Sequence, residues 1–296
     1  MVSKLKIRYR MKIFSKTKYI IIIIILELLL NSNIYSQCNC LGAGLGGGLN
    51  QPTGTTNRGI LPKHNFRTQV LYKHRNGDKY YSKDSQIGKG FINEFNSDYL
   101  GWLIGYGFTN DLSLEAEFGF FPNQKVDYYY KSIRESGSPT LYLSGKYNVY
   151  SSYFNQFEFT AGAGIKIPFQ PFSYGFVLHS FLHKGFGESG FDSYLITRAE
   201  LNALDKNDFQ QGHSISNSFY LTKSIFEKFF AISEIRGDFA FKDRQSKRDL
   251  DSTGFFVLTI APQIVYSFSE FYVAAIYDIP IYRYFNGKQI AAKQSF

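Results

Sequence analysis

Charged side chains recur at every second position in several apolar segments of this 296-residue chain. Arg67, Lys73 and Arg75 fall on one face of such a segment, and Glu115 and Glu117 fall on one face of another. Charges arranged in this way can pair with one another, or they can line a water-filled path and select which ions pass. The complete set of candidate lining residues is Arg67, Lys73, Arg75, Glu115, Glu117, Lys146, Glu158, Lys166, Arg198, Glu200, Glu234, Arg236 and Asp278.

Cysteine and histidine pairs are the residues whose spacing could hold a metal. Cys38 and Cys40 supply two thiolates, which is half of the four ligands of a closed tetrahedral site. His179 and His183 would share one face of a helix, but on a strand this spacing separates them by about 13 Å. We therefore expect no cofactor and no metal site. Cys38 and Cys40 are the only weak candidates for metal ligands.

His213 and Ser214 are the pair that could act as base and nucleophile, with Asn217 close by in the sequence. Adjacent residues of a strand point to opposite faces, so their imidazole and hydroxyl groups cannot meet. The glycine-rich run at 42–48 lacks the strand, the helix and the Gly-Lys-Ser/Thr ending of a phosphate-binding loop. The sequence predicts that the chain is not an enzyme.

The elements that must position the charged side chains are strands. In residues 112–121 every second residue from Leu112 to Phe120 is apolar, and Glu115 and Glu117 lie between them. Residues 65–75 and 157–167 alternate in the same way. Alternation with a period of two is typical of strands, and no segment after the N-terminal region needs a helical period.

Two architectures fit alternating strands: a soluble sandwich and a membrane-spanning barrel. The segments have the roughly 10–12 residues of a tilted spanning strand, whereas strands of soluble proteins cluster near 5–6. Short connections at 109–111 and 268–270 alternate with long ones at 122–138 and 240–252. The sequence therefore predicts an all-β protein, an antiparallel transmembrane β-barrel, placed in the outer membrane of a Gram-negative bacterium.

The alternation predicts about twelve strands, with ten as the alternative because residues 168–214 hold either two strands or none. The expected strands are 65–75, 98–108, 112–121, 140–150, 156–167, 172–183, 190–202, 215–222, 228–239, 254–267, 271–282 and 289–296. Residues 65–296 form the barrel in this interpretation. Phe296 supplies the terminal aromatic residue of many outer-membrane barrels, through which we expect the barrel-assembly machinery to act.

Residues 1–36 have the layout of a cleaved secretory signal peptide. A basic region ends at Lys18, and the apolar run that follows is about 12 residues, too short to span a bilayer. Cleavage after Ser36 leaves 37–64 as a Cys- and Gly-rich periplasmic tether; lipidation of Cys38 is the alternative, which the large Gln37 disfavours. Residues 1–36 hold much of the net charge of +9. Because the basic excess lies in a segment that is removed, we expect no nucleic-acid partner for the mature protein.

Several stretches resemble a family of outer-membrane transporters named after the meta-pathway of phenol degradation. The sequence "IYDIPIYRYFNGKQI" at 276–290 is similar to the family's "QxPxYRxxNGxQL" ending. "TIAPQIVY" at 259–266, "AGAGIKIPF" at 161–169 and "GESGFDSY" at 187–194 resemble three further family motifs. The resemblance covers roughly residues 65–290, and it implies an outer-membrane barrel more firmly than it implies any substrate.

We expect a barrel that transports small solutes, hydrophobic or aromatic ones included, with outer-membrane lipid around it. The alternative is a non-transporting barrel whose outer loops, such as 79–96 and 124–134, bind a partner. We also expect Glu115 and Glu117 to form an ion-pair network with Arg67, Lys73 and Arg75. Gly101, Gly105 and Gly107 would leave the space between them.

Overall fold

The computed structural model describes residues 59–88, 92–137, 139–169, 173–269 and 271–296. The expected signal peptide, Cys38 and Cys40 lie outside the described residues. Within the described ranges, no helix has the length and apolar character needed to cross a bilayer.

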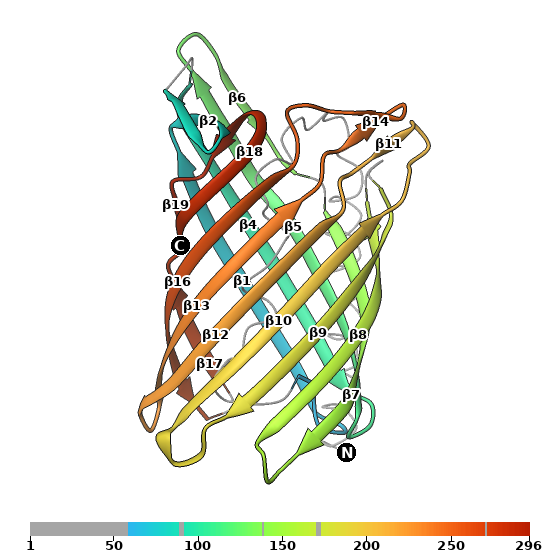
Figure 1. Cartoon of the computed structure of the whole chain (residues 1–296), viewed down its shortest axis with the longest axis vertical. Coiled ribbons are helices and arrows are strands. Elements are labelled where there is room, and N and C mark those ends of the chain that lie inside the picture. The colour runs from blue at the N-terminus through green and yellow to red at the C-terminus, as the bar shows by residue number, and fades with distance from the viewer. Residues whose placement is uncertain (1–58, 89–91, 138, 170–172, 270) are drawn as a thin grey trace, which may run out of the picture. The chain divides into compact units, whose positions relative to one another are not determined.

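The described chain folds as an antiparallel β-barrel (Figure 1). Residues 168–214 contribute two long strands, which was the favoured of the two sequence predictions. Each long strand is hydrogen-bonded to its neighbours in sequence order. The long strands are β1 (Phe66–Gly77), β4 (Ile92–Gly107), β5 (Leu112–Tyr128), β7 (Thr140–Ser152), β8 (Phe157–Pro168), β9 (Gly175–Gly185), β10 (Phe191–Asn202), β12 (Ser214–Phe226), β13 (Phe229–Ala240), β16 (Phe255–Phe268) and β18 (Ile279–Ala291).

Short strands extend the wall or cross its upper connections. Two regions expected as loops are built differently: 79–96 contains two short strands and the start of β4, and β5 runs on past Pro122 to pair with β6. The β4–β5 pairing is irregular between Asp98 and Leu100, and such an irregularity accommodates a proline that has no N–H to donate. The short strands are β2 (Lys79–Lys83), β3 (Ser85–Gly88), β6 (Ser132–Glu135), β11 (Phe209–Gln210), β14 (Arg244–Gln245), β15 (Arg248–Asp249), β17 (Phe271–Ile276) and β19 (Gln294–Ser295).

The barrel closes where the end of the chain meets β1 and β2. Ala291 pairs with Lys79 and Ser295 pairs with Arg75, in one antiparallel register. The expected strand 271–282 is interrupted after Ile276, so that β17 and β18 both pair with β16. The expected strand 289–296 is divided between β18 and β19. Among the described residues, β17 is paired on one side only.

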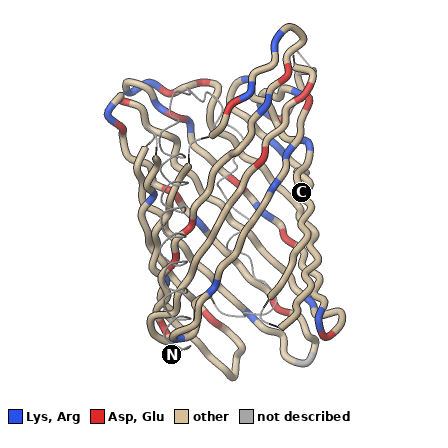
Figure 2. The backbone as a smooth tube through the Cα atoms, turned by 180° about the vertical axis from the view of Figure 1, so that it is seen from behind, with Lys and Arg blue, Asp and Glu red and all other residues tan. Residues whose placement is uncertain are grey.

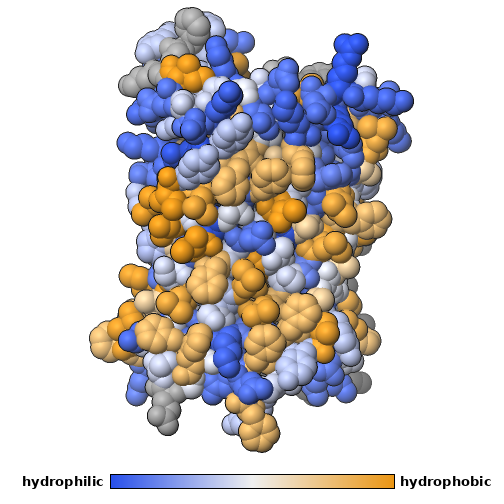
Figure 3. Space-filling view, viewed as in Figure 1, coloured by the Kyte–Doolittle hydropathy of each residue, from blue (hydrophilic) through white to orange (hydrophobic). Residues whose placement is uncertain are grey.

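The barrel is polar inside and apolar outside. Along β12 buried and exposed residues alternate without exception from Ser214 to Thr222, and the buried ones are serines, a tyrosine and a threonine. The exposed ones include Ile215, Phe219 and Leu221. Figure 3 shows the result on the outer surface, where hydrophobic residues form a broad band below the hydrophilic upper end.

Aromatic side chains gather at the short turns of the lower end. An exposed phenylalanine lies at or beside each of the five short turns, namely Phe108, Phe154, Phe186, Phe226 and Phe271. Phe154 is 98% exposed. Phe229 and Phe239 mark the two ends of the outer face of β13, ten residues apart. That separation is about 33 Å along a strand, or about 25 Å in height at a tilt near 40°.

Candidate functional site

The charged residues predicted from the sequence lie on the inner face of the wall. All thirteen point inward in the alternating burial pattern, and all but Arg67 are buried. Figure 2 shows acidic and basic residues along the strands as well as at the upper connections. Their burial shows that these side chains pack against one another and against their neighbours instead of facing a wide, solvent-filled pore.

Glu115 joins one group of charges on neighbouring strands. Its two carboxylate oxygens accept from Arg67 Nη2 at 2.9 Å and from Lys146 Nζ at 2.7 Å. The expected Arg67–Glu115 contact across β4 is therefore present. The space beside Gly105 is shared, however: a Cβ atom there would lie 2.9 Å from Leu61 and 3.5 Å from Glu115.

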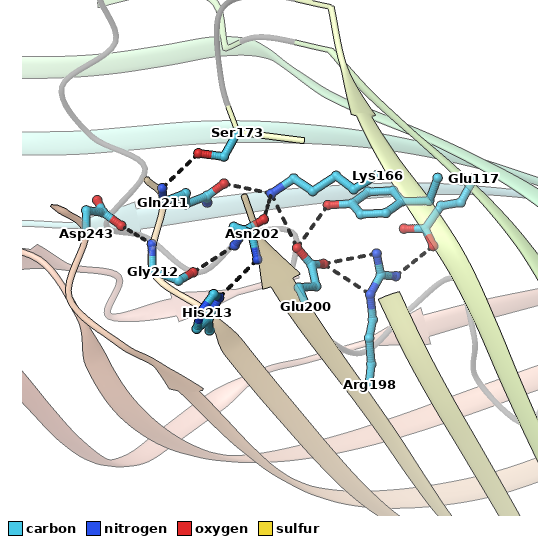
Figure 4. A network of polar contacts seen from close by, with 11 residues as sticks. Glu117, Lys166, Ser173, Arg198, Glu200, Asn202, Gln211, Gly212, His213 and Asp243 are labelled. Atoms are coloured by element: carbon cyan, nitrogen blue, oxygen red, sulfur yellow. Dashed lines mark hydrogen bonds and ion pairs between the residues drawn. The ribbon is translucent and has the colours of Figure 1, made fainter. Parts of the chain in front are cut away.

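Glu117 was expected to pair with Lys73 or Arg75 of the first strand. Its partner is instead Arg198, which reaches it across the interior of the barrel. Arg198 Nη1 lies 2.7 Å from Glu117 Oε2, and three strands (β7, β8 and β9) separate β5 from β10 in the wall. Arg198 also pairs with Glu200 at 3.1 Å and stacks over the ring of Tyr142 at 4.3 Å. This ion pair crosses the lumen (Figure 4).

Lys166 lies between the Arg198–Glu200 ion pair and Gln211 in an upper loop of the barrel. Its ammonium donates to Gln211 Oε1 at 2.7 Å and to Asn202 Oδ1 at 3.0 Å, and Glu200 Oε2 lies 3.5 Å away (Figure 4). The Ser173 hydroxyl accepts from the Gln211 N–H at 2.9 Å. Asn202 and Gln211 were not predicted. Neutral amides at a strand end, as Asn202 is, or in a connection, as Gln211 is, carry no sequence signal of such a role.

A third group surrounds Asp278 near the closure of the barrel. Asp278 Oδ2 accepts from Lys73 Nζ at 2.7 Å and from Arg236 Nη2 at 2.9 Å. Arg236 also pairs with Glu234 at 3.1 Å and Asp238 at 3.0 Å. Lys73 was expected to pair with Glu115 or Glu117. It reaches Asp278 because Asp278 pairs with Ser295, which in turn pairs with Arg75 of β1 where the barrel closes.

Glu158 holds the segment that precedes β1. Its Oε1 accepts the Gly59 N–H at 3.0 Å. Ile60 and Leu61 are 3% and 4% exposed. On the opposite side, Gly107 faces the Leu61 and Pro62 carbonyls so closely that an added Cβ would lie 1.9 Å from the Pro62 oxygen. The end of the segment expected to be a free periplasmic tether thus lies inside the lower end of the barrel.

Two of the histidines considered as ligand or base, His183 and His213, make contacts within the wall. His183 Nε2 lies 2.9 Å from Asp192 Oδ1, and its ring stacks on Tyr194. His213 Nδ1 accepts the Asn202 N–H at 3.0 Å. In the part of the chain that the structure describes, no three His, Cys, Asp or Glu residues gather as a metal site would require.

The fold and its interior define a class: an antiparallel β-barrel with an apolar outer surface and an internal network of paired charges. No protein-family model and no curated protein sequence matches the chain. Among solved structures, the chain is similar to the COG4313 outer membrane channel from Pseudomonas putida F1, with a TM-score of 0.60 and 12% sequence identity. The match covers 80% of this chain and 94% of the channel. It establishes the barrel fold.

Proposed function

We propose that the chain is an outer-membrane barrel of a Gram-negative bacterium that passes small uncharged solutes, hydrophobic or aromatic ones included. The observation that supports a location in the membrane is the apolar outer surface of the barrel. Its apolar band between Phe229 and Phe239 has the roughly 25 Å height of a barrel's lipid-facing zone, and aromatic residues flank it. The similarity in fold to an outer membrane channel supports transport.

The internal charges support passage of uncharged rather than ionic solutes. The carboxylates of Glu115, Glu117 and Asp278 each have a basic partner within 3 Å. Fixed charges that are paired in this way present little net field to a passing ion. The residues proposed to line the path are the thirteen named above.

The remaining parts of the proposal concern export and assembly. We take residues 1–36 as the signal peptide that directs export. Phe296 is the residue through which the assembly machinery recognises the barrel, and outer-membrane lipid is its surrounding partner. Membership of the meta-pathway family is part of the same proposal and rests on the sequence motifs such as the one at 276–290. The likeness in fold to an outer membrane channel supports the coarser statement, an outer-membrane barrel.

A second function is favoured by one observation, the contacts that cross the interior of the barrel. The Arg198–Glu117 ion pair crosses the interior of the barrel, and the segment that Glu158 holds through the Gly59 N–H lies in its lower end. A barrel with such contacts could serve as a scaffold for partners that bind its upper connections, without transport.

Liposome swelling and planar-bilayer recordings on the refolded barrel separate the two functions. We expect uptake of small uncharged solutes at a low ionic conductance. Correctly folded protein that gives neither uptake nor conductance would reject transport and favour the scaffold.

A further inference from the structure

The wall of the barrel contains a space one strand wide that no described strand occupies. Ser295 pairs with Arg75 of β1 on one side and with Asp278 on the other, so at this height a single strand separates β1 from Asp278. Below this height, β17 leads up to Asp278 and residues 66–73 of β1 lead up to Arg75. Among the described residues, no strand lies between these two stretches. We call the space between them the lane.

Backbone groups on both sides point into the lane. His74 and Phe296 exchange two hydrogen bonds at its upper end, at 2.7 and 3.0 Å, so every second residue of β1 below His74 directs its N–H and C=O groups into the lane. β17 does the same below Asp278, which exchanges hydrogen bonds with Ser295. Lipid offers no hydrogen bond to an open sheet edge, so the lane calls for a strand. The residues of β1 that face it, all with side chains exposed on the outer face of the wall, are Phe66, Thr68, Val70 and Tyr72.

Direction restricts which strand fits. β1 and β17 both run upward from the lower end, so a strand that is antiparallel to both must run downward. A second copy of the chain, inserted in the same orientation, offers the same two upward strands and could pair only in parallel. A downward strand that precedes β1 in this same chain would finish at the lower end. The described chain begins there, with the Gly59 N–H bound to Glu158.

Residues 42–49 have the residue pattern that such a strand needs. Their even-numbered positions are all glycine, and their odd-numbered positions are Ala43, Leu45, Gly47 and Leu49. On a strand the two sets lie on opposite faces. The alternation therefore predicts an apolar face for lipid and a face without side chains for the interior. The interior beside the lane is crowded, since Lys73 is 4% exposed and Arg67 is half-buried, and glycine suits a strand at such a position.

The stretch between this run and Gly59 is long enough to reach the lane. Gly59 lies against Thr160 of β8, and Leu61 lies against Gly105 of β4, so very few residues cross the lower end of the barrel. β4 is the neighbour of β1 in the wall. Residues 50–58 can extend over about 30 Å, which is ample for the same crossing.

We propose that residues 42–49 form the strand that fills the lane, antiparallel to β1, with Leu45 opposite Val70 and Leu49 opposite Phe66. The barrel then closes along its whole height without a strand from another protein. The inference rests on the proposed function in that cleavage after Ser36 leaves residues 42–49 on the mature chain and lipid surrounds the wall.

The test is disulfide cross-linking of the folded full-length barrel in outer membranes, with heat-dependent gel migration as the measure of folding. Val70→Cys is combined in turn with Gly44→Cys, Leu45→Cys and Gly46→Cys. Cα atoms of a hydrogen-bonded antiparallel pair lie about 5.5 Å apart, which a disulfide can span. Leu45→Cys should cross-link at least about ten-fold faster than either glycine variant, because adjacent residues point to opposite faces.

Leu45→Cys combined with Ile235→Cys, on the outer face of β13, is the matched control and should not cross-link. Leu49→Cys with Phe66→Cys tests the same register at the lower end, and it takes the place of the first pair if that variant does not fold. All variants lack the two native cysteines.

Equal cross-linking at positions 44, 45 and 46 would overturn the strand, because an unpaired segment near β1 has no preferred face. Folded barrels without any cross-link would also overturn it and leave the lane to another protein. A disulfide-linked dimer would place the strand in a second copy and overturn closure within one chain. Each of these results leaves the proposed transport standing, since solute uptake is measured separately. Cross-linking as expected without uptake would retain the strand and reject transport.

Discussion

The residue with the most consequence for the lumen is Glu117, because its partner Arg198 comes from across the barrel. Removing one member of a buried ion pair costs about 3–5 kcal/mol when the other is left unpaired. Arg198 keeps Glu200 as a partner, so Glu117→Gln should cost less, about 1–3 kcal/mol. We expect a melting temperature several degrees lower, measured by circular dichroism on the folded barrel.

Glu227→Gln, at an exposed turn position, is the control and should leave the melting temperature unchanged. Reversal potentials on the same variants separate the two roles of the charge. A shift toward anions in Glu117→Gln would place the carboxylate on the ion path, whereas an unchanged melting temperature would contradict its role as a brace.

Asp243 predicts a pH dependence in the upper connections. Burial raises the pKa of this carboxyl, although it accepts the Gly212 N–H at 2.7 Å. An acid with a raised pKa binds its proton more tightly when folded, so its contribution to stability falls as the pH rises above its ordinary value near 3.8.

Asp243→Asn should therefore be more stable than the parent at pH 7 and equal to it below about pH 4. Its amide oxygen can still accept the Gly212 N–H. Unfolding in urea at the two pH values measures the difference. A stability gap that is the same at both would show that the charge of Asp243 is not its cause.

The inward position of these residues could be predicted from alternation alone, but their partners could not. Glu115 and Arg67 lie two strands apart in sequence order, so their contact was foreseeable. The contacts of Lys73 with Asp278 and of Arg198 with Glu117 depend on how a closed wall curves. No local pattern carries that information.

At the scale of elements, β18 shows how a side chain can replace a missing backbone donor. Pro280 has no N–H with which to continue the pairing toward the chain end. Arg283 instead donates through Nη2 to the carbonyls of Ala292 at 2.8 Å and Lys293 at 3.1 Å, and it lies over the ring of Tyr81.

Arg283→Gln should leave at least one of these carbonyls without a donor and cost about 1–3 kcal/mol. Pro280→Ala restores an N–H and should recover part of that loss in the double variant, although not in the parent. Heat-dependent migration of the folded barrel in detergent gels measures all four proteins. If the stability changes of Arg283→Gln and Pro280→Ala simply added in the double variant, Arg283 would not be substituting for the N–H that Pro280 lacks.

Strand existence was predictable and strand ends were less so. Pro122 reads as the start of a loop, yet β5 continues beyond it because the irregular pairing near Asp98 tolerates a proline. The interruption at Tyr277 was missed for the opposite reason. Apolar residues alternate through it without a break, although β17 ends at Ile276.

At the scale of the whole molecule, the segment at 59–62 limits the lower opening of the lumen. Gly107 leaves no room for a side chain beside Pro62. Gly107→Ala should displace the segment and raise single-channel conductance. Gly237→Ala is the control, since its nearest contact would be an ordinary 3.6 Å from Phe256. Equal conductance in both variants would mean that the segment does not restrict the path.

The pairing of Ser295 with Arg75 joins residues that are far apart in the chain. Contacts of such separation form late, because the loop that they close costs entropy before it is repaid. Until then β1 presents an open edge that could pair with another chain. Productive folding therefore depends on shielding the first strand until the last one has been made, so the rate of aggregation should rise with any change that delays the synthesis or docking of the final residues.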